Sequence, residues 1–310
     1  MRWFRREMTG ILAALGLVIG GQVFAGAQES PPFLLERMQV EGLENVFRVR
    51  PDLYSGGQPT EAGFAELAKL GVKTVISVDG AAPELDLAHK YGMRYVHLPI
   101  GYDSVPVEQQ RKLVKARLTF PGPVYIHCHH GKHRGPAAVM SLCRATDPTL
   151  TAARAADSLK VMGTAARYAG LYASVAAARP PTDEALRKLS AEFPEKVAVS
   201  ATAEQMGAID GAWDRLKAAA KEGAAQGADR RALLASVVEL EELVTEAGRL
   251  VEGDAPGLKP AFTTATTQIR RERESLEKPN AAISREEVNQ LAARLEQSCN
   301  QCHAVHRDRK

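Results

Sequence analysis

The first half of the chain alternates short runs of β-branched and aromatic residues with amphipathic stretches, from about residue 53 to residue 178. β-Branched runs predict strands, whereas apolar residues three or four positions apart predict helices. We expect strands at Val72–Val78, Met93–Leu98 and Val124–His127, and helices at Glu61–Leu70 (capped by Thr60) and Val107–Thr119. This alternation predicts an α/β domain in residues 28–180, with a central, mostly parallel sheet flanked by helices.

The pattern changes after the sequence Arg179-Pro180-Pro181-Thr182, which predicts the start of a linker over residues 181–198. Four long segments with helical periodicity and no strand alternation follow, at about Ser200–Lys221, Asp229–Glu252, Leu258–Glu277 and Ser284–His306. Helices of about 20 residues joined by short connections are typical of antiparallel bundles. Residues 199–310 are therefore predicted to form an all-α four-helix bundle.

The first residues have the three-part layout of a secretory signal. Arg2, Arg5 and Arg6 precede an apolar run from Ile11 to Phe24, and small residues follow at 25–27. We expect a signal peptide over residues 1–27 and a periplasmic or otherwise exported protein. The apolar run is shorter than the roughly 20 residues that cross a bilayer, so we expect no stable membrane anchor after cleavage; an uncleaved anchor is the alternative.

Composition narrows the classes of protein that remain. The 310 residues are 25% charged and 45% hydrophobic, which excludes a disordered chain. Lys and Arg number 40 against 37 Asp and Glu, and no basic face is evident, so we expect no binding to nucleic acid. Four cysteines are too few for a disulfide scaffold of this length.

Cys128 directly follows the strand predicted at Val124–His127, and Arg134 lies six positions further on, where a helix is predicted to start near Pro136. This spacing suits phosphate chemistry, because backbone N–H groups of the intervening loop and the helix N-terminus can surround phosphate oxygens. The guanidinium of Arg134 can hold two of these oxygens in a fork. Cys128 is then placed as the nucleophile.

His127-Cys128-x5-Arg134, with Gly131 inside the loop, resembles the cysteine-dependent protein phosphatases of the compact dual-specificity type. The segment Ser55-Gly56-Gly57-Gln58-Pro59 is similar to the opening of a bacterial branch of that family. The resemblance covers about residues 49–178. It implies Cys128 and Arg134 as catalytic residues, with residues of the loop binding the substrate phosphate: His129, His130, Gly131, Lys132 and His133. Rhodanese-type sulfurtransferases have a loop one residue shorter and fit less well.

The family also uses an aspartic acid that protonates the leaving group. Asp103 lies at the matching place, after a predicted strand, while a turn-capping role for it and Asp79 as general acid are the alternatives. One residue departs from the pattern: Gly135 stands where the family has Ser or Thr, whose hydroxyl assists release of the thiolate. The resemblance therefore implies slow turnover or an inactive domain.

Two other groups near the loop have simpler interpretations. A metal site built from His129, His130 and His133 is an alternative, although neighbouring residues of a tight loop rarely converge on one ion. Cys143 is interpreted as a buried structural thiol, because its position along the next helix is too distant for a disulfide with Cys128.

Cys299-Asn300-Gln301-Cys302-His303 is the attachment pattern of a c-type haem. Cys299 and Cys302 form thioethers to such a haem, and His303 reaches its iron as an axial ligand. A redox disulfide or a zinc pair is the alternative, but a disulfide does not require the histidine, and zinc needs two further ligands. We therefore expect one covalent haem c.

The position of this motif on the last predicted helix is similar to the cytochrome c-prime family, which are four-helix bundles with haem on the final helix. The resemblance covers about residues 200–310, and Arg307 matches a basic residue of that family. Met206 is the candidate sixth iron ligand; alternatively, it packs with Ile209, Trp213 and Leu216. Members of the family often pair, so a homodimer through the bundle is a further expectation.

Together these features predict an exported phosphatase acting on phosphoprotein or small phosphoesters, joined to a haem that senses redox state or gas. The alternative is an electron-transfer or gas-binding cytochrome, with its own redox partner, whose phosphatase-like domain is inactive and only binds anions or a partner. A third hypothesis is that Cys128 is itself oxidised, so that thiol and haem respond to one oxidant.

Overall fold

In the computed structural model, residues 32–81, 83–226, 230–251, 257–277 and 283–307 are described. The signal peptide expected at residues 1–27 lies outside them. The α/β part contains β1 (Glu36–Val40), β2 (Leu43–Arg50), β3 (Leu53–Gly56), α1 (Glu61–Lys69), β4 (Thr74–Ser77), α2 (Leu85–Lys90), β5 (Arg94–His97), α3 (Val107–Thr119), β6 (Val124–His127), α4 (Arg134–Thr146), α5 (Ala152–Val161), α6 (Ala169–Ala177) and α7 (Asp183–Lys188).

These strands form one mixed sheet in the order β1-β2-β3-β6-β4-β5. The pairs β3–β6, β6–β4 and β4–β5 are parallel, as expected, whereas β1–β2 and β2–β3 are antiparallel. The strands β1, β2 and β3 were not predicted from the sequence, and the sheet is less parallel than expected because β1–β2 and β2–β3 are antiparallel. β1 is an edge strand that is largely exposed, and such strands show little apolar alternation.

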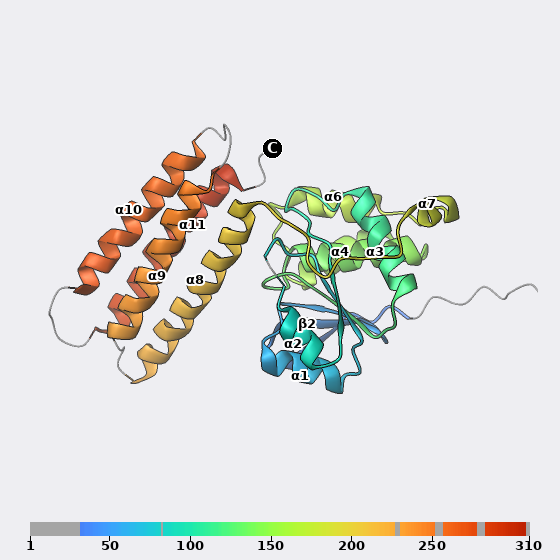
Figure 1. Cartoon of the computed structure of the whole chain (residues 1–310), viewed down its shortest axis with the longest axis horizontal. Helices are drawn as coiled ribbons and strands as arrows, with labels where there is room; N and C mark the ends of the chain where they lie inside the picture. Colours follow the sequence, from blue (N-terminus) through green and yellow to red (C-terminus); the bar gives the residue numbers. More distant parts are fainter. Residues whose placement is uncertain (1–31, 82, 227–229, 252–256, 278–282, 308–310) are drawn as a thin grey trace, which may run out of the picture. The chain divides into compact units, whose positions relative to one another are not determined.

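The two faces of the sheet are covered by different helices (Figure 1). Alternate residues of a strand point to opposite faces, and in β6 the side chains of Val124 and Ile126 join one apolar cluster while Tyr125 joins the other. The first cluster contains buried side chains of α3 to α6, and the second those of α1 and α2. The sheet is thus buried on both sides.

The first predicted helix is confirmed with its cap. Thr60 accepts a hydrogen bond from the backbone N–H of Gly63 at its Oγ1 (3.3 Å), and Gly71 follows the helix with φ +77°. The helix predicted at 107–119 has the same bounds in the structure. These helices help to position β4 and β6, and the candidate site begins at the ends of these two strands.

The predicted linker at 181–198 is in large part bound to the α/β domain. It contains α7, and Phe193 packs edge-on against Phe120 with ring centroids 5.6 Å apart. The N–H of His97 donates to the carbonyl of Pro194 (3.0 Å), and the N–H of Val197 donates to His97 Nδ1 (3.0 Å). Because β5 ends the sheet, backbone groups on its outer edge need partners, and this segment supplies one for the N–H of His97.

The C-terminal helical region consists of α8 (Ala201–Gln226), α9 (Arg230–Arg249), α10 (Leu258–Glu277) and α11 (Arg285–His306). All four predicted helices are therefore present. They share one cluster of buried apolar residues, to which each helix contributes: for example Leu216, Val237, Ile269 and Leu291. Ser284 caps α11 in a capping box with Glu287. Among the described residues, no helix combines the length and apolar character that crossing a membrane requires.

Candidate functional site

Cys128 lies at the carboxyl end of β6, between the parallel strands β3 and β4. His127 pairs with Gly56 on one side and Ser77 on the other, so the chain leaves the sheet at its centre. The loop then runs to α4, which begins at Arg134, two residues before the expected start. Pro136 lies in the first turn of the helix, where no N–H is required.

The loop is held by hydrogen bonds to its carbonyl groups. Donors from three different parts of the domain each reach one carbonyl at 2.8 Å: the N–H of Gln58 reaches His129, Asn45 Nδ2 reaches Gly131, and Thr164 Oγ1 reaches Lys132. With these carbonyls bonded to the surrounding protein, the loop is fixed from outside.

The N–H groups of the loop differ from its carbonyl groups in that they are not bonded to the surrounding backbone that the structure describes. Within the described part of the chain, no backbone carbonyl accepts a hydrogen bond from the N–H groups of residues 130–133. Buried or half-buried N–H groups without partners are costly unless a ligand or water accepts from them. A curved loop whose carbonyls are bonded outward and whose N–H groups remain free is a site for an anion.

Gly131 is required by the shape of this loop. Its φ of +65° disfavours any residue with a side chain, and a Cβ added there would lie 2.2 Å from the carbonyl carbon of Gly56. The loop therefore packs closely against the backbone of the segment Ser55-Gly56-Gly57-Gln58. Tyr125 fixes it further by donating its hydroxyl to the carbonyl of Gly57 (2.6 Å).

Cys128 is 3% exposed and its thiol is free. A Cβ added to Gly135 would lie 3.5 Å from Cys128 Sγ. Position 135 thus faces the sulfur, and the glycine there supplies no hydroxyl. Cys143 is also a free thiol and, as expected, is fully buried on α4, where burial raises its pKa.

Arg134 is buried, with 7% exposure, beside this loop. Its Nη2 donates to Asp79 Oδ2 at 3.0 Å, and its guanidinium carbon lies 4.3 Å from the ring centroid of Tyr102. Its Nε has no partner among the described residues. Part of the guanidinium fork is therefore free to bind an anion.

Burial and charge pairing set the protonation states of the side chains beside the loop. Burial alone raises the pKa of Asp79, but the Arg134 guanidinium, the hydrogen bond from the N–H of Ala81 and the nearby His129 and His127 together lower the pKa to about 2. Burial lowers the pKa of Arg134, and Asp79 raises it above its usual value. Burial also lowers the pKa of His127 to about 4, and its Nε2 is hydrogen-bonded to the Tyr95 hydroxyl at 2.6 Å. Asp79 is thus an anion and His127 neutral at neutral pH.

Asp103 lies in the connection between β5 and α3, where it is half-buried. Its Oδ1 is turned towards Gly101 in its own loop, at 2.4 Å from where a Cβ of that glycine would be. The preceding residue, Tyr102, is the one whose ring contacts Arg134. The role of Asp103 as general acid stays a prediction.

Three residues near the loop were not found from the sequence. Asn45 holds the carbonyl of Gly131 from β2, a strand that was not predicted, and Tyr102 and Tyr125 resemble ordinary core aromatics in the sequence. The positive φ of Asn45, +49°, has no marker in the sequence either. Asp79 was weighed only as an alternative acid.

The second cysteine motif lies near the end of α11. Cys299, Cys302 and His303 are three and four positions apart, so they share one face of the helix. Both thiols are free, and Arg307 Nη1 donates to His303 Nδ1 at 3.3 Å. Two reduced thiols and an adjacent imidazole match the donor set of a c-type haem. Because a ligating histidine usually keeps its proton on the other ring nitrogen, His303 would lose the bond from Arg307 if it held a haem.

Met206 packs against the apolar cluster of the helical region, together with Ile209, Trp213 and Leu216 as the alternative interpretation expects. Asp210, one turn further along α8, lies close enough to Cys299 to act with burial in raising the pKa of that thiol to about 11. The role of Met206 as an iron ligand stays a prediction.

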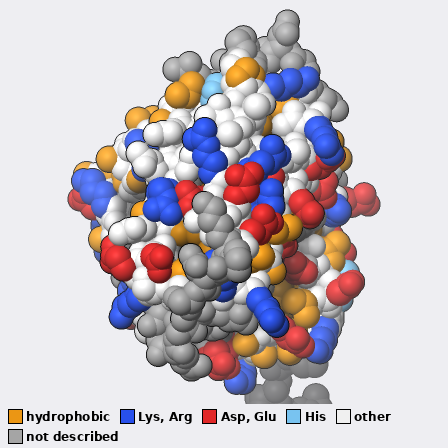
Figure 2. Space-filling view, turned by 90° about the vertical axis from the view of Figure 1, so that its left-hand side faces the viewer, with side chains coloured by type: hydrophobic (Ala, Val, Ile, Leu, Met, Phe, Trp, Pro, Cys, Tyr) orange, Lys and Arg blue, Asp and Glu red, His pale blue; other side chains and the backbone are white. Residues whose placement is uncertain are grey.

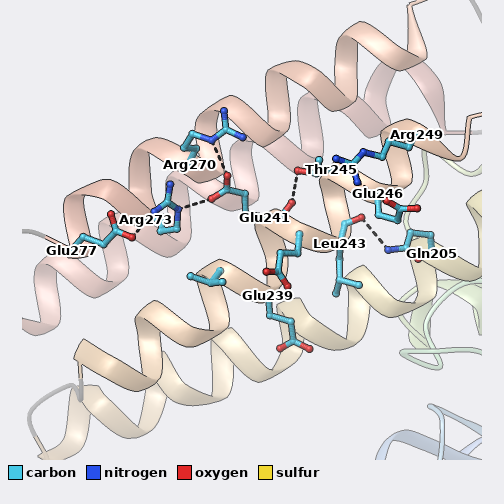
Figure 3. Close-up of a pocket in the computed structure, with 12 residues that line it drawn as sticks. Gln205, Glu239, Glu241, Leu243, Thr245, Glu246, Arg249, Arg270, Arg273 and Glu277 are labelled. Carbon is cyan, nitrogen blue, oxygen red and sulfur yellow. Dashed lines mark hydrogen bonds and ion pairs between the residues drawn. The ribbon is translucent and has the colours of Figure 1, made fainter.

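A hollow of about 810 Å³ lies between α9 and α10, with Gln205 of α8 at its edge (Figure 3). Glu241 accepts from Arg270 Nε at 2.8 Å and from Arg273 Nε at 2.7 Å. These central charges are thus paired within the protein. In the face drawn in Figure 2, acidic and basic side chains are likewise interspersed. None of the predicted site residues lines this hollow.

Comparison with known proteins gives matches to the α/β part. Residues 51–146 match the family model Tc-R-P, described as "Polymorphic toxin system, DSP-PTPase phosphatase". The dual specificity protein phosphatase TpbA of Pseudomonas aeruginosa strain UCBPP-PA14 is 31% identical over 140 residues, which are 43% of this chain and 61% of that protein. The same protein of strain PAO1 is 31% identical over 143 residues, with the same coverage.

The chain thus spans 61% of the length of these curated relatives. A crystal structure of P. aeruginosa TpbA has a TM-score of 0.41 and 21% identity, covering 49% of this chain and 94% of that one. The sequence similarity to a dual-specificity-type phosphatase family thus lies at about residues 51–146.

Proposed function

We propose that the chain hydrolyses phosphomonoesters, with phosphoprotein as the substrate class, through a cysteinyl-phosphate intermediate. The observation that carries this proposal is the loop of residues 128–134: its carbonyls at 129, 131 and 132 are bonded outward, while the N–H groups of residues 130–133 lack described acceptors. The unpartnered Nε of Arg134 beside it adds a charged donor. The sequence similarity to protein phosphatases supports the same function.

The first chemical step transfers the phosphoryl group to the protein. The thiolate of Cys128 attacks phosphorus, and the S–P bond forms as the bond from phosphorus to the leaving oxygen breaks. The carboxyl of Asp103 gives its proton to that oxygen, so the alcohol or phenol leaves neutral. The loop N–H groups and Arg134 hold the remaining phosphoryl oxygens, where negative charge is spread in the transition state.

In the second step, water attacks phosphorus, Asp103 accepts a proton from that water, and the S–P bond breaks to release phosphate and the Cys128 thiolate. At residue 135 the glycine offers no hydroxyl to the departing sulfur, although the position faces it. We infer that this step is the slower one.

For the helical region, we propose a bundle that holds one haem c, attached through Cys299 and Cys302 and ligated by His303, with Met206 as the sixth ligand. Such a group would supply redox chemistry when Met206 is its sixth ligand, and would bind small gases only if Met206 did not ligate it. This part of the chain contributes the thiols, the imidazole and the apolar cluster shared by α8–α11. Haem attachment requires export, which agrees with the proposed signal peptide and a periplasmic location. Pairing of two chains through this region, and a separate redox partner, belong to the same proposal.

A second candidate function is a cytochrome whose phosphatase-like domain binds anions or a partner without turnover. Gly135 favours it, because the missing hydroxyl removes a group that assists the second step. This alternative requires that the loop binds anions while no phosphate is released from a phosphoester.

The test of the proposed function compares hydrolysis of an aryl phosphate by the full chain, by Cys128→Ser and by Cys143→Ser. We expect the first substitution to abolish hydrolysis and the second, at the buried structural thiol, to preserve it. Equal rates for wild type and Cys128→Ser would contradict the proposal. Absorption spectra of the exported protein, oxidised and reduced, test the haem separately.

A further inference from the structure

Asp79 lies two residues after the end of β4 and is held rigidly at the edge of the loop of residues 128–134. It is 5% exposed, and its carbonyl accepts a hydrogen bond from His97 Nε2 at 2.8 Å. Its Oδ1 accepts from the N–H of Ala81 at 3.0 Å. With the backbone and one carboxylate oxygen fixed in this way, the direction of the other oxygen, Oδ2, is determined.

Oδ2 accepts from two donors that the proposed function assigns to phosphate. The N–H of His129, the first residue of the loop after Cys128, donates at 2.5 Å, and Arg134 Nη2 donates at 3.0 Å. The same oxygen thus takes one backbone and one guanidinium donor. Arg134 Nε remains without a described partner, so the clamp is only partly filled.

We propose that Asp79 is a built-in competitor of the substrate phosphate, whose carboxylate takes the place of one phosphoryl oxygen in the free protein and thereby sets the affinity for oxyanions. This inference rests on the proposed function. A phosphate that enters the loop must displace Oδ2 from His129 and Arg134 or bind beside its negative charge. Either course weakens the binding of an anion.

Two other roles for Asp79 fit the structure less well. A proton donor must be protonated before it acts, whereas the contact with Arg134 keeps Asp79 ionised. A residue that only orders Arg134 would be partly redundant, because burial and the ring of Tyr102 also confine that side chain. Neither role explains why Oδ2 also takes the N–H of His129.

The experiment measures binding of tungstate, an inert tetrahedral oxyanion, to the full chain by isothermal titration calorimetry. The variants are Asp79→Asn, which removes the charge at nearly constant shape, and Asp86→Asn, which makes the same change at an exposed residue of α2. Removing a negative charge a few ångströms from the anion should tighten binding about tenfold. Asp86→Asn should bind as wild type does.

Two further variants keep the test decisive. Asp79→Ala replaces Asp79→Asn if the asparagine variant does not fold, as judged by circular dichroism, and should also bind more tightly. Asp79→Glu retains the charge and should not gain affinity. Equal or weaker binding by the folded neutral variants, or absence of binding by all of them, would overturn the proposal.

Kinetics separate this proposal from the proposed function. If Asp79 competes with phosphate, KM for an aryl phosphate falls in Asp79→Asn, whereas loss of a general acid would lower kcat instead. Tighter tungstate binding without hydrolysis in any variant would support the role of Asp79 and refute the phosphatase. Hydrolysis by wild type without tighter binding by the neutral variants would refute only the role of Asp79.

Discussion

Cys128 and the pair formed by Cys299 and Cys302 lie in opposite kinds of backbone. The loop after β6 leaves its N–H groups without described backbone acceptors, whereas α11 is helical across its whole motif. In a helix each N–H is bonded to the carbonyl four residues earlier. The backbone around Cys128 can therefore bind an anion, while α11 offers only side chains.

This difference shows which part of each motif carries its specificity. For Cys128, supporting residues far away in the sequence, such as Asn45 and Thr164, decide the shape of the site. For Cys299 and Cys302, the spacing along one helix is sufficient to place the donors on one face. The first motif should be sensitive to changes in the fold, and the second only to changes in its own side chains.

The largest expected effect separates the two motifs. Replacing Cys299 and Cys302 together by Ala should abolish covalent haem completely, because both thioether sulfurs are gone. Hydrolysis of an aryl phosphate by the same variant should remain, since the anion loop is built within the α/β domain. Haem is measured by absorption after denaturation and extraction. Haem that stays attached in this variant would contradict the proposed ligation.

The next effect tests the shape of the anion loop. Gly131→Ala should lower hydrolysis by about 100-fold or more, because its Cβ would collide with the backbone of Gly56, and small displacements of catalytic groups cost that much. Gly92→Ala is the matched control: Gly92 also has positive φ, +68°, but nothing lies within 4 Å of an added Cβ. Activity is compared by steady-state kinetics. Equal rates in the two variants would show that the loop shape does not matter.

A third effect concerns acid stability of the α/β domain. Burial lowers the pKa of His127 from 6.5 to about 4, so between these values the unfolded chain binds a proton that the folded domain does not. Stability should therefore fall as the pH is lowered from 6.5 to 4, by at most about 3 kcal/mol. Burial lowers the pKa of His97 as well, which adds to the same trend.

Amide hydrogen exchange in β6 as a function of pH measures this effect for the α/β domain alone. His127→Gln should flatten the pH dependence of the opening free energy. His89→Gln, at an exposed histidine of α2, should leave it unchanged. A slope that survives in His127→Gln would assign the acid sensitivity to other groups.

The smallest effect concerns Gly135. Gly135→Ser would place a side chain about 3.5 Å from Cys128 Sγ, where a hydroxyl can stabilise the departing thiolate. We expect the second chemical step to become about tenfold faster, the effect of one hydrogen bond to a charged group. Pre-steady-state kinetics should show a smaller burst relative to the steady rate. Gly135→Ala, which has no hydroxyl, should give no such gain.

Much of the fold could be predicted because its signals are local. The strands β4, β5 and β6 and the helices α1, α3 and α8–α11 follow from apolar periodicity and caps such as Thr60. β1 and β2 could not be found in this way, since their exposed or mixed faces show little alternation, and β3, with only four residues, was not found either. The binding of residues 193–197 to β5 depends on a free sheet edge, which the sequence does not reveal.

The residues of the candidate site likewise fall into those that local sequence signals reveal and those that only the fold brings together. Cys128, Gly131 and Arg134 could be predicted because their spacing along the chain is fixed by the loop that they form. Asp79 and Tyr102 could not be assigned, because the contacts that bring them to Arg134 depend on how separate strands pair. The neighbouring Asp103 was favoured over Asp79 by its matching place in a family pattern.

The most direct test of the account is a search for the covalent intermediate. The full chain is mixed with an aryl phosphate, quenched in acid within the first turnover, digested, and analysed by mass spectrometry. The account predicts one phosphoryl group on the peptide that contains Cys128, which is absent in Cys128→Ser and accumulates because the second step is slow. Rapid hydrolysis with no phosphoryl group on Cys128, or with the group on another residue, would contradict it.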